Sequence, residues 1–121
     1  MPLLNFQKQF ASAVKNRTKR QTIRAKRKHP IKVDDTLYLY TGLRTKHTKK
    51  LGKAICLSTE DIVITEESTF IKNLGNSRWK ECGVMEEHDL AWSDGFKGVA
   101  EMREYFRSTH GLPFSGDLIK W

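Results

Sequence analysis

The densest group of residues that could do chemistry is a run of positive charge near the start of the chain. Eight of the fourteen residues from Lys15 to Lys28 are Lys or Arg, and the run reads KNRTKRQTIRAKRK. The β-branched pair Thr22 and Ile23 interrupts it, which a purely solvated tail would not need. The pattern predicts a loop that leads into a short strand, Gln21 to Ala25, with cations on both sides. An anionic partner, above all phosphate, is the natural ligand of such a surface.

The positive charge is concentrated in one half of the 121-residue chain. Residues 1–53 hold 15 Lys and Arg against 2 acids, a balance of +13, whereas residues 54–121 hold 7 against 12, a balance of −5, which together give +8. If the two halves fold together, one face becomes strongly positive, as nucleic-acid-binding proteins require. The alternative is a surface that only keeps the protein soluble, although solubility does not call for such segregation.

A second basic segment, Leu43 to Lys50, reads LRTKHTKK and is expected to be an exposed loop. It either closes over a bound nucleic-acid backbone or is simply a solvated loop. The cations of the two segments that are predicted to bind nucleic acid are Arg17, Lys19, Arg20, Arg24, Lys26, Arg27, Lys28, Arg44 and Lys46.

Other kinds of site are not indicated. The four histidines are scattered without metal-ligand spacing, and no Walker-type glycine loop, GxSxG or dinucleotide motif occurs, so we expect no metal and no cofactor. Cys56 and Cys82 lack C-x-x-C spacing, which favours reduced, buried thiols. The first ten residues do not read as a signal peptide, and no apolar run approaches the ~20 residues of a membrane span. We therefore expect a soluble, cytoplasmic protein without a membrane partner.

The elements that must position the basic residues are short. Helices are expected at about residues 5–15, 86–92 and 98–110, with Asn16 and Gly111 closing the first and the last. Strand-forming runs lie at residues 21–25, 36–40, 53–58, 62–65, 69–74, 78–82 and 118–121, with connections at residues 59–61 and at Gly75-Asn76. The pattern predicts a single α+β domain over residues 1–121, with five or six short strands in a small, strongly curved sheet or barrel flanked by helices.

The segment Lys19-Arg20-Gln21-Thr22-Ile23-Arg24 resembles the G-x-K-x-x-T-x-R signature near the start of ASCH domains. Later residues are similar to the second half of that family, namely Asp94-Gly95-Phe96, Glu101-Met102, Phe106, Gly111 and Leu118-Ile119-Lys120-Trp121. The resemblance covers nearly the whole chain and is strongest to phage and prophage members of about this length. It implies a PUA-like β-barrel, a cleft between barrel and helices, and a role in binding RNA or nucleotides. The chain departs from the family at Arg17 and Asp34, where glycine is usual.

Some ASCH proteins are amidohydrolases that remove the acetyl group from N4-acetylcytidine, and the resemblance implies such an activity as an alternative. Their proposed lysine, threonine and glutamate correspond by position to Lys19, Thr22 and Asp94. A hydroxyl becomes a nucleophile when a base takes its proton, and a lysine amine serves when burial or nearby cations lower its pKa. Asp94 has on the order of 1.5 Å less reach than a glutamate. Without catalysis, Lys19 would contact phosphate, Thr22 would be a strand residue and Asp94 a turn or N-cap residue.

Two aromatic residues are candidates to stack on an unpaired base, an interaction worth about 1–3 kcal/mol per base. Tyr40 shares one face of its predicted strand with Tyr38 and lies beside a turn. Trp92 lies near the mouth of the cleft if the family geometry applies; otherwise both are core aromatics. We thus expect RNA or a modified nucleoside as the partner, with the base between Thr22 and Asp94. A third possibility is an acidic protein partner, and the sequence leaves the oligomeric state open.

Overall fold

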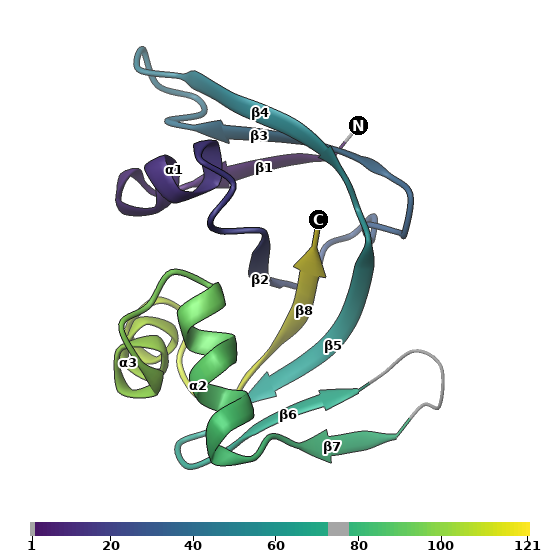
Figure 1. The fold of residues 1–121 in the computed structure, drawn as a ribbon, viewed down its shortest axis with the longest axis vertical. Helices are drawn as coiled ribbons and strands as arrows, with labels where there is room; N and C mark the ends of the chain where they lie inside the picture. Colours follow the sequence, from purple (N-terminus) through teal and green to yellow (C-terminus); the bar gives the residue numbers. More distant parts are fainter. Residues whose placement is uncertain (1, 73–77) are drawn as a thin grey trace.

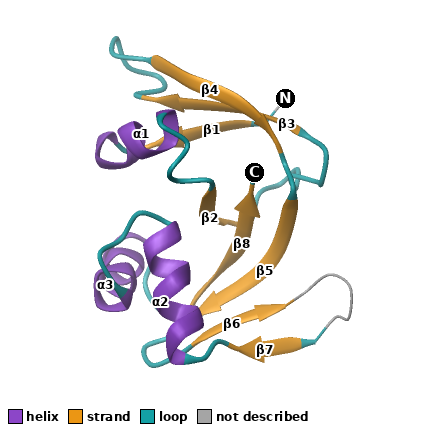
Figure 2. Ribbon diagram, in the orientation of Figure 1, coloured by secondary structure: helices purple, strands orange, loops and turns teal. Residues whose placement is uncertain are grey.

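The computed structural model describes residues 2–72 and 78–121, and within them the chain forms eight strands and three helices (Figures 1 and 2). In chain order these are β1 (Leu3–Phe6), α1 (Lys8–Lys15), β2 (Gln21–Ala25), β3 (Thr36–Thr41), β4 (Lys49–Ile55), β5 (Ser58–Ile64), β6 (Thr69–Lys72), β7 (Trp79–Glu81), α2 (Val84–Ser93), α3 (Val99–Thr109) and β8 (Phe114–Lys120). The predicted α+β class is therefore confirmed, and the expected number of strands was too small.

The strands form two sheets, one in the order β1-β3-β4 and the other in the order β2-β8-β5-β6-β7. Only β1 and β3 pair in parallel; the other pairings of the described residues are antiparallel. β4 passes almost directly into β5, so this stretch of chain joins the two sheets (Figure 1). Helix α1 packs on the three-stranded sheet, whereas α2 and α3 lie together beside the five-stranded one. The pairings in the described part of the chain do not close into one barrel.

The N-terminal segment was predicted wrongly at its start. Leu4 and Phe6 are buried in alternation with exposed neighbours, which is the period of a strand, and Gln7 keeps an extended backbone before the helix begins at Lys8. Phe6, Phe10 and Val14 have the spacing of one helix face, but only Phe10 and Val14 belong to the helix. The last strand also starts earlier than predicted, at Phe114, and it is a central strand that pairs with both β2 and β5 rather than a short terminal one.

Other element boundaries agree with the predictions in part. Strand β2 has the predicted bounds, β3 buries Leu37 and Leu39 while Tyr38 and Tyr40 face outward, and Asn16 caps the end of α1. The predicted connection at residues 59–61 is instead part of β5, and the basic loop ends where β4 begins at residue 49. The predicted Gly75-Asn76 turn and the end of the 69–74 run lie outside the described residues.

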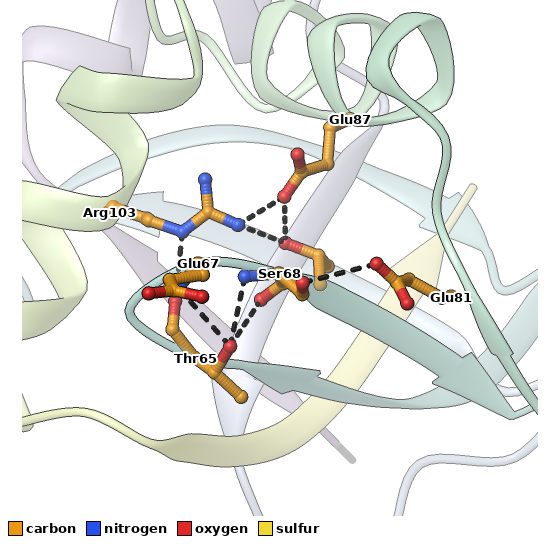
Figure 3. Close-up of polar contacts among 7 residues, drawn as sticks. Thr65, Glu67, Ser68, Glu81, Glu87 and Arg103 are labelled. Atoms are coloured by element: carbon orange, nitrogen blue, oxygen red, sulfur yellow. Dashed lines mark hydrogen bonds and ion pairs between the residues drawn. The ribbon is translucent and has the colours of Figure 1, made fainter.

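A buried polar network joins the two C-terminal helices to the second sheet (Figure 3). Arg103 of α3 donates from Nε to the Thr65 carbonyl at 2.8 Å and pairs through Nη2 with Glu87 of α2. Glu87 also accepts the Thr69 hydroxyl at 2.7 Å. Because Arg103 and Glu87 are both largely buried, their charges depend on each other for compensation. The network holds α2 against the sheet and so also positions the C-terminal end of this helix.

Among the residues described, no helix combines the length and apolar character needed to cross a bilayer. Cys56 is buried between β4 and β5 and Cys82 is half-buried, and both are free thiols.

Candidate functional site

A cavity of about 270 Å³ lies where β1, β2 and the C-terminal helices meet, and Lys19, Thr22 and Asp94 all line it. These three residues are at most 5% exposed. The rest of the wall combines aromatic rings with a few polar groups: Asn5, Phe6, Gln7, Phe10, Ile23, Arg24, Phe96, Tyr105, Phe106 and His110. Asp94 follows Lys19 and Thr22 by more than 70 positions in the chain, so the fold brings distant segments together at this cavity.

Lys19 reaches the cavity through the turn that ends α1. Arg17 has a left-handed backbone, φ 66°, and its N–H donates to the Val14 carbonyl at 3.2 Å. The N–H groups of Thr18 and Lys19 both donate to the Ala13 carbonyl at 3.0 Å. This is the Schellman arrangement of a helix C-terminus, with arginine where glycine is usual. It folds the chain back across the helix end and directs Lys19 inward.

Asp94 is positioned by a second turn of the same kind. It caps the C-terminus of α2, and Gly95 follows with φ 97°. The Gly95 N–H donates to the Trp92 carbonyl at 3.0 Å, and the Phe96 N–H donates to the Ala91 carbonyl at 2.9 Å. Asp94 is thus the C-cap of the preceding helix, not an N-cap of the following one. The Asp94-Gly95-Phe96 sequence sets this geometry because only the middle position needs a left-handed backbone.

Lys19 and Asp94 form a buried ion pair. Lys19 Nζ donates to the Asp94 main-chain carbonyl at 2.6 Å and lies 3.3 Å from Oδ1 of its carboxylate. Gln21 Nε2 lies 3.3 Å from the same Oδ1 and 3.3 Å from the Leu90 carbonyl. Lys19 thereby satisfies the Asp94 carbonyl at the end of α2, whereas the Leu90 carbonyl also accepts the Asp94 N–H at 3.1 Å. The Lys19 ammonium also lies over the Phe10 ring, 5.1 Å from its centroid.

Burial shifts both titrating groups of the pair toward their neutral forms. Desolvation lowers the pKa of Lys19, although the charge and hydrogen bond of Asp94 act in the opposite direction. Desolvation likewise raises the pKa of Asp94, against the charge of Lys19 and the hydrogen bond from Gln21. A lowered pKa increases the fraction of the Lys19 amine that is unprotonated, and only an unprotonated amine can act as a general base.

Thr22 carries a hydroxyl that is oriented by its neighbour on the strand. Arg24 Nε donates to Thr22 Oγ1 at 2.9 Å, so this oxygen accepts a charged hydrogen bond and keeps its own hydrogen to donate. Arg24 is itself fixed, because Nη2 donates to the Asn5 carbonyl at 2.6 Å and the guanidinium lies 4.7 Å from the centroid of the Phe6 ring. The arginine thus connects β2 to β1 across the rim of the cavity.

The structure divides the predicted basic surface into separate parts. Arg24, Arg27 and Arg44 line one pocket beside the cavity. Arg17 and Arg20 instead line a small hollow near the C-terminus, where Arg20 Nε donates to the Trp121 carbonyl at 3.2 Å.

Three other predicted cations lie outside both the cavity and this pocket. Lys26 pairs with the carboxylates of Asp61 and Asp117, so the sheet already neutralises its charge. Lys28 and Lys46 are exposed and are not among the residues that line the cavity or the arginine-lined pocket beside it.

The two predicted stacking residues lie away from the cavity wall. Tyr40 is half-buried on the outer face of β3, between Asn5 and Lys50 of the neighbouring strands. Trp92 is 67% exposed, so the expectation that it belongs to the core was wrong. It lines a shallow hollow together with Lys19 and Lys97, on a different side of Lys19 from the cavity.

Sequence reasoning missed residues that complete the site. Gln21 was read only as part of the basic run, yet it orients the Asp94 carboxylate. Asn5 was placed in the first helix, whereas it ends up beside Arg24 in β1. The one usable signal was Gln21, a polar residue at the start of a strand whose next two residues are also buried. Tyr105 and His110 reach the cavity from α3 and its C-cap, which only the packing of that helix determines.

Comparisons of the chain with protein-family models, with curated proteins and with solved structures found no match. The resemblance to the ASCH family is therefore carried by the motifs and their spacing alone. Across residues 2–72 and 78–121, no group of three or more His, Cys, Asp or Glu side chains is arranged to hold a metal ion.

Proposed function

We propose that the chain binds a nucleotide unit of RNA, or a modified nucleoside, with the base in the cavity lined by Lys19, Thr22 and Asp94. The observation that carries this proposal is the composition of the cavity wall, which sets these polar groups beside the rings of Phe10, Phe96 and Tyr105. A heterocyclic base needs both an aromatic surface and hydrogen-bonding partners for its edge. The volume of about 270 Å³ lies just below the range of about 300–1,000 Å³ that is typical of pockets for drug-sized ligands.

The ASCH assignment and its PUA-like fold are part of this proposal. Arg17 and Asp34, the two positions at which the family usually has glycine, have φ of 66° and 74°. Glycine adopts this region at little cost, whereas other residues do so rarely. The backbone at both positions is therefore the one that a glycine would favour, which supports the resemblance. The strongly curved passage from β4 to β5 supports a barrel-like arrangement of the two sheets.

A second candidate is an amidohydrolase that acts on N4-acetylcytidine or a related amide. It is favoured by the hydrogen bond from Arg24 to Thr22, since a charged donor stabilises a hydroxyl oxygen that becomes negative. The Thr22 oxygen would attack the amide carbonyl while its proton passes to the neutral Lys19 amine. The nucleoside amine would then leave with that proton, and water would hydrolyse the acyl ester on Thr22.

Two measurements on the purified chain separate these candidates. Titration with a short, single-stranded, fluorescent oligoribonucleotide and with free nucleosides tests binding, and incubation with N4-acetylcytidine tests for released cytidine. Turnover that is lost in Lys19→Met, in a variant whose folding is verified by its thermal transition, supports the enzyme. Binding without turnover supports the first candidate alone. A chain that neither binds these ligands nor releases cytidine contradicts both.

A further inference from the structure

The pocket that Arg24, Arg27 and Arg44 share, called here the arginine pocket, lies directly beside the cavity. Its volume is about 550 Å³, and its remaining wall is formed by Leu3, Asn5 and Leu43, so it contains no acidic residue. The three guanidinium groups come from β2, from the segment just after it and from the β3–β4 loop. Segments that are distant in the chain therefore converge to place like charges together.

The arginine pocket differs from the sites of Arg103 and Arg107 in the way that its charges are compensated. Arg103 and Arg107 each pair with carboxylates. Among the described ion pairs, by contrast, none involves Arg27 or Arg44, and both are exposed. The charge of Arg27 acts on Arg24 and contributes to lowering its pKa, after the larger effect of burial. An anion that enters between neighbouring positive charges reduces their mutual repulsion, so such a pocket favours anion binding.

Hydrogen bonds connect the segments that form the wall of the arginine pocket. Asn5 connects its parts: the Asn5 carbonyl accepts from Arg24 Nη2 at 2.6 Å, and Asn5 Oδ1 accepts from the Leu43 N–H at 3.0 Å. The loop that carries Arg44 is braced internally, since Thr45 Oγ1 and Thr48 Oγ1 donate to the Gly42 carbonyl at 2.7 and 2.9 Å. The loop predicted at residues 43–50 thus has internal hydrogen bonds, and its residues Leu43 and Arg44 form part of the pocket wall.

We propose that the arginine pocket binds a phosphate group of the same ligand whose base occupies the cavity, so that the ligand is a nucleotide rather than a free nucleoside. Asn5 and Arg24 line both spaces, which allows one molecule to extend from one into the other. Guanidinium groups bind phosphate oxygens in a bidentate manner, and three of them around one pocket suit a dianion or a backbone phosphodiester. This inference rests on the proposed function, because it assigns the base to the cavity.

The test compares each ligand with and without its phosphate. Calorimetric titration of the full chain would use the four common ribonucleosides and N4-acetylcytidine, each as the free nucleoside and as its 5′- and 3′-monophosphates. A short oligoribonucleotide without terminal phosphates distinguishes a backbone phosphate from a terminal one. The same series is run on Arg27→Gln/Arg44→Gln and on the control Lys32→Gln/Lys72→Gln, which removes the same charge from residues that do not line the cavity or the arginine pocket.

We expect at least one phosphorylated ligand to bind the wild type and the control at least about tenfold more tightly than its nucleoside. In Arg27→Gln/Arg44→Gln this ratio should fall to about one. Equal affinity for nucleoside and nucleotide in the wild type would overturn the phosphate site while leaving the proposed function intact. A ratio that falls equally in the control would also overturn it, since general charge would then explain the preference. Absence of binding by every ligand would overturn the proposed function itself.

Discussion

Asp94 occupies a position that is unfavourable for a carboxylate. It ends α2, where the helix dipole disfavours negative charge by about 0.3–1 kcal/mol, and it is 5% exposed. Lys19 and Gln21 compensate for both costs by direct contact. Their contacts also give the pair a structural role, since they close the end of a helix. The proposed site and the fold therefore share these side chains, and variants at this site need a stability measurement beside any binding assay.

The lowered pKa of Lys19 gives a pH dependence whose sign is fixed. Between that lowered value and the ordinary value of 10.5, the unfolded chain binds a proton at Lys19 that the folded chain lacks. Stability contributed by this residue must therefore rise with pH in that window. We expect the free energy of unfolding of the wild type, relative to Lys19→Met, to increase as the pH approaches 10.5, measured by urea denaturation. A difference that stays flat or falls would show that Lys19 keeps its proton in the fold.

Gly95 is constrained both by its backbone and by its surroundings. A Cβ there would lie 2.9 Å from Phe10 Cδ1, in addition to the cost of φ 97°. Gly111 is a matched control, because its φ is 83° but nothing lies within 4 Å of its Cβ position. We expect Gly111→Ala to cost about 1–2 kcal/mol, and Gly95→Ala to cost a further ~1–3 kcal/mol from overpacking. Equal losses in chemical denaturation would mean that the Phe10 ring moves freely.

At the scale of elements, the Arg103–Glu87 network should matter more than any surface pair. Glu87→Ala leaves Arg103 buried without its counterion, for which we expect a loss of about 3–5 kcal/mol. Glu66 pairs with Arg107 but is 62% exposed, so Glu66→Ala should cost far less than Glu87→Ala. Thermal and urea unfolding of both variants measure the difference. Similar small losses would show that solvent reaches the Arg103 side chain.

Two elements were predicted nearly to the residue, for different reasons. Helix α3 has an apolar stripe between clear stop signals, whereas β2, whose first three residues are all buried, was located by its β-branched pair Thr22 and Ile23. Strand β1 was missed because Phe6 and Phe10 fit a helical spacing as well as their true placement in two elements. The first part of β8 was missed, although its burial alternates from Phe114 to Leu118, because Gly116 and Asp117 are residue types that strands rarely contain.

For the whole molecule, the sequence indicated a basic face but not how its charges are divided. Lys26 looked equivalent to Arg27, yet only the sheet register brings Asp61 and Asp117 beside Lys26. Similarly, the meeting of Arg24 and Arg44 depends on β1 lying parallel to β3, which no local pattern encodes. The lysine, threonine and aspartate of the cavity were identified by resemblance. The contact between Lys19 and Asp94 could be known only from the position of the C-terminus of α2 in the fold.

This division of charge predicts an unequal salt dependence of binding. On single strands, the logarithm of affinity falls with the logarithm of salt concentration by about 0.7 per phosphate contact. Arg27→Gln should therefore reduce the slope by about 0.7, whereas Lys26→Gln should change it much less, because the charge of Lys26 is paired within the protein. Fluorescence anisotropy with a short oligoribonucleotide across a salt series measures both slopes. Equal changes in the two variants would contradict the division.

The central claim is that the cavity between Lys19, Thr22 and Asp94 receives the base of a nucleotide. The most direct measurement is nuclear magnetic resonance mapping of the isotope-labelled chain during titration with ribonucleoside monophosphates. The account predicts that Thr22, Ile23 and Tyr105, which line the cavity, shift together and saturate at the same ligand concentration. Shifts confined to exposed lysines such as Lys46, with these three signals unmoved, would contradict it.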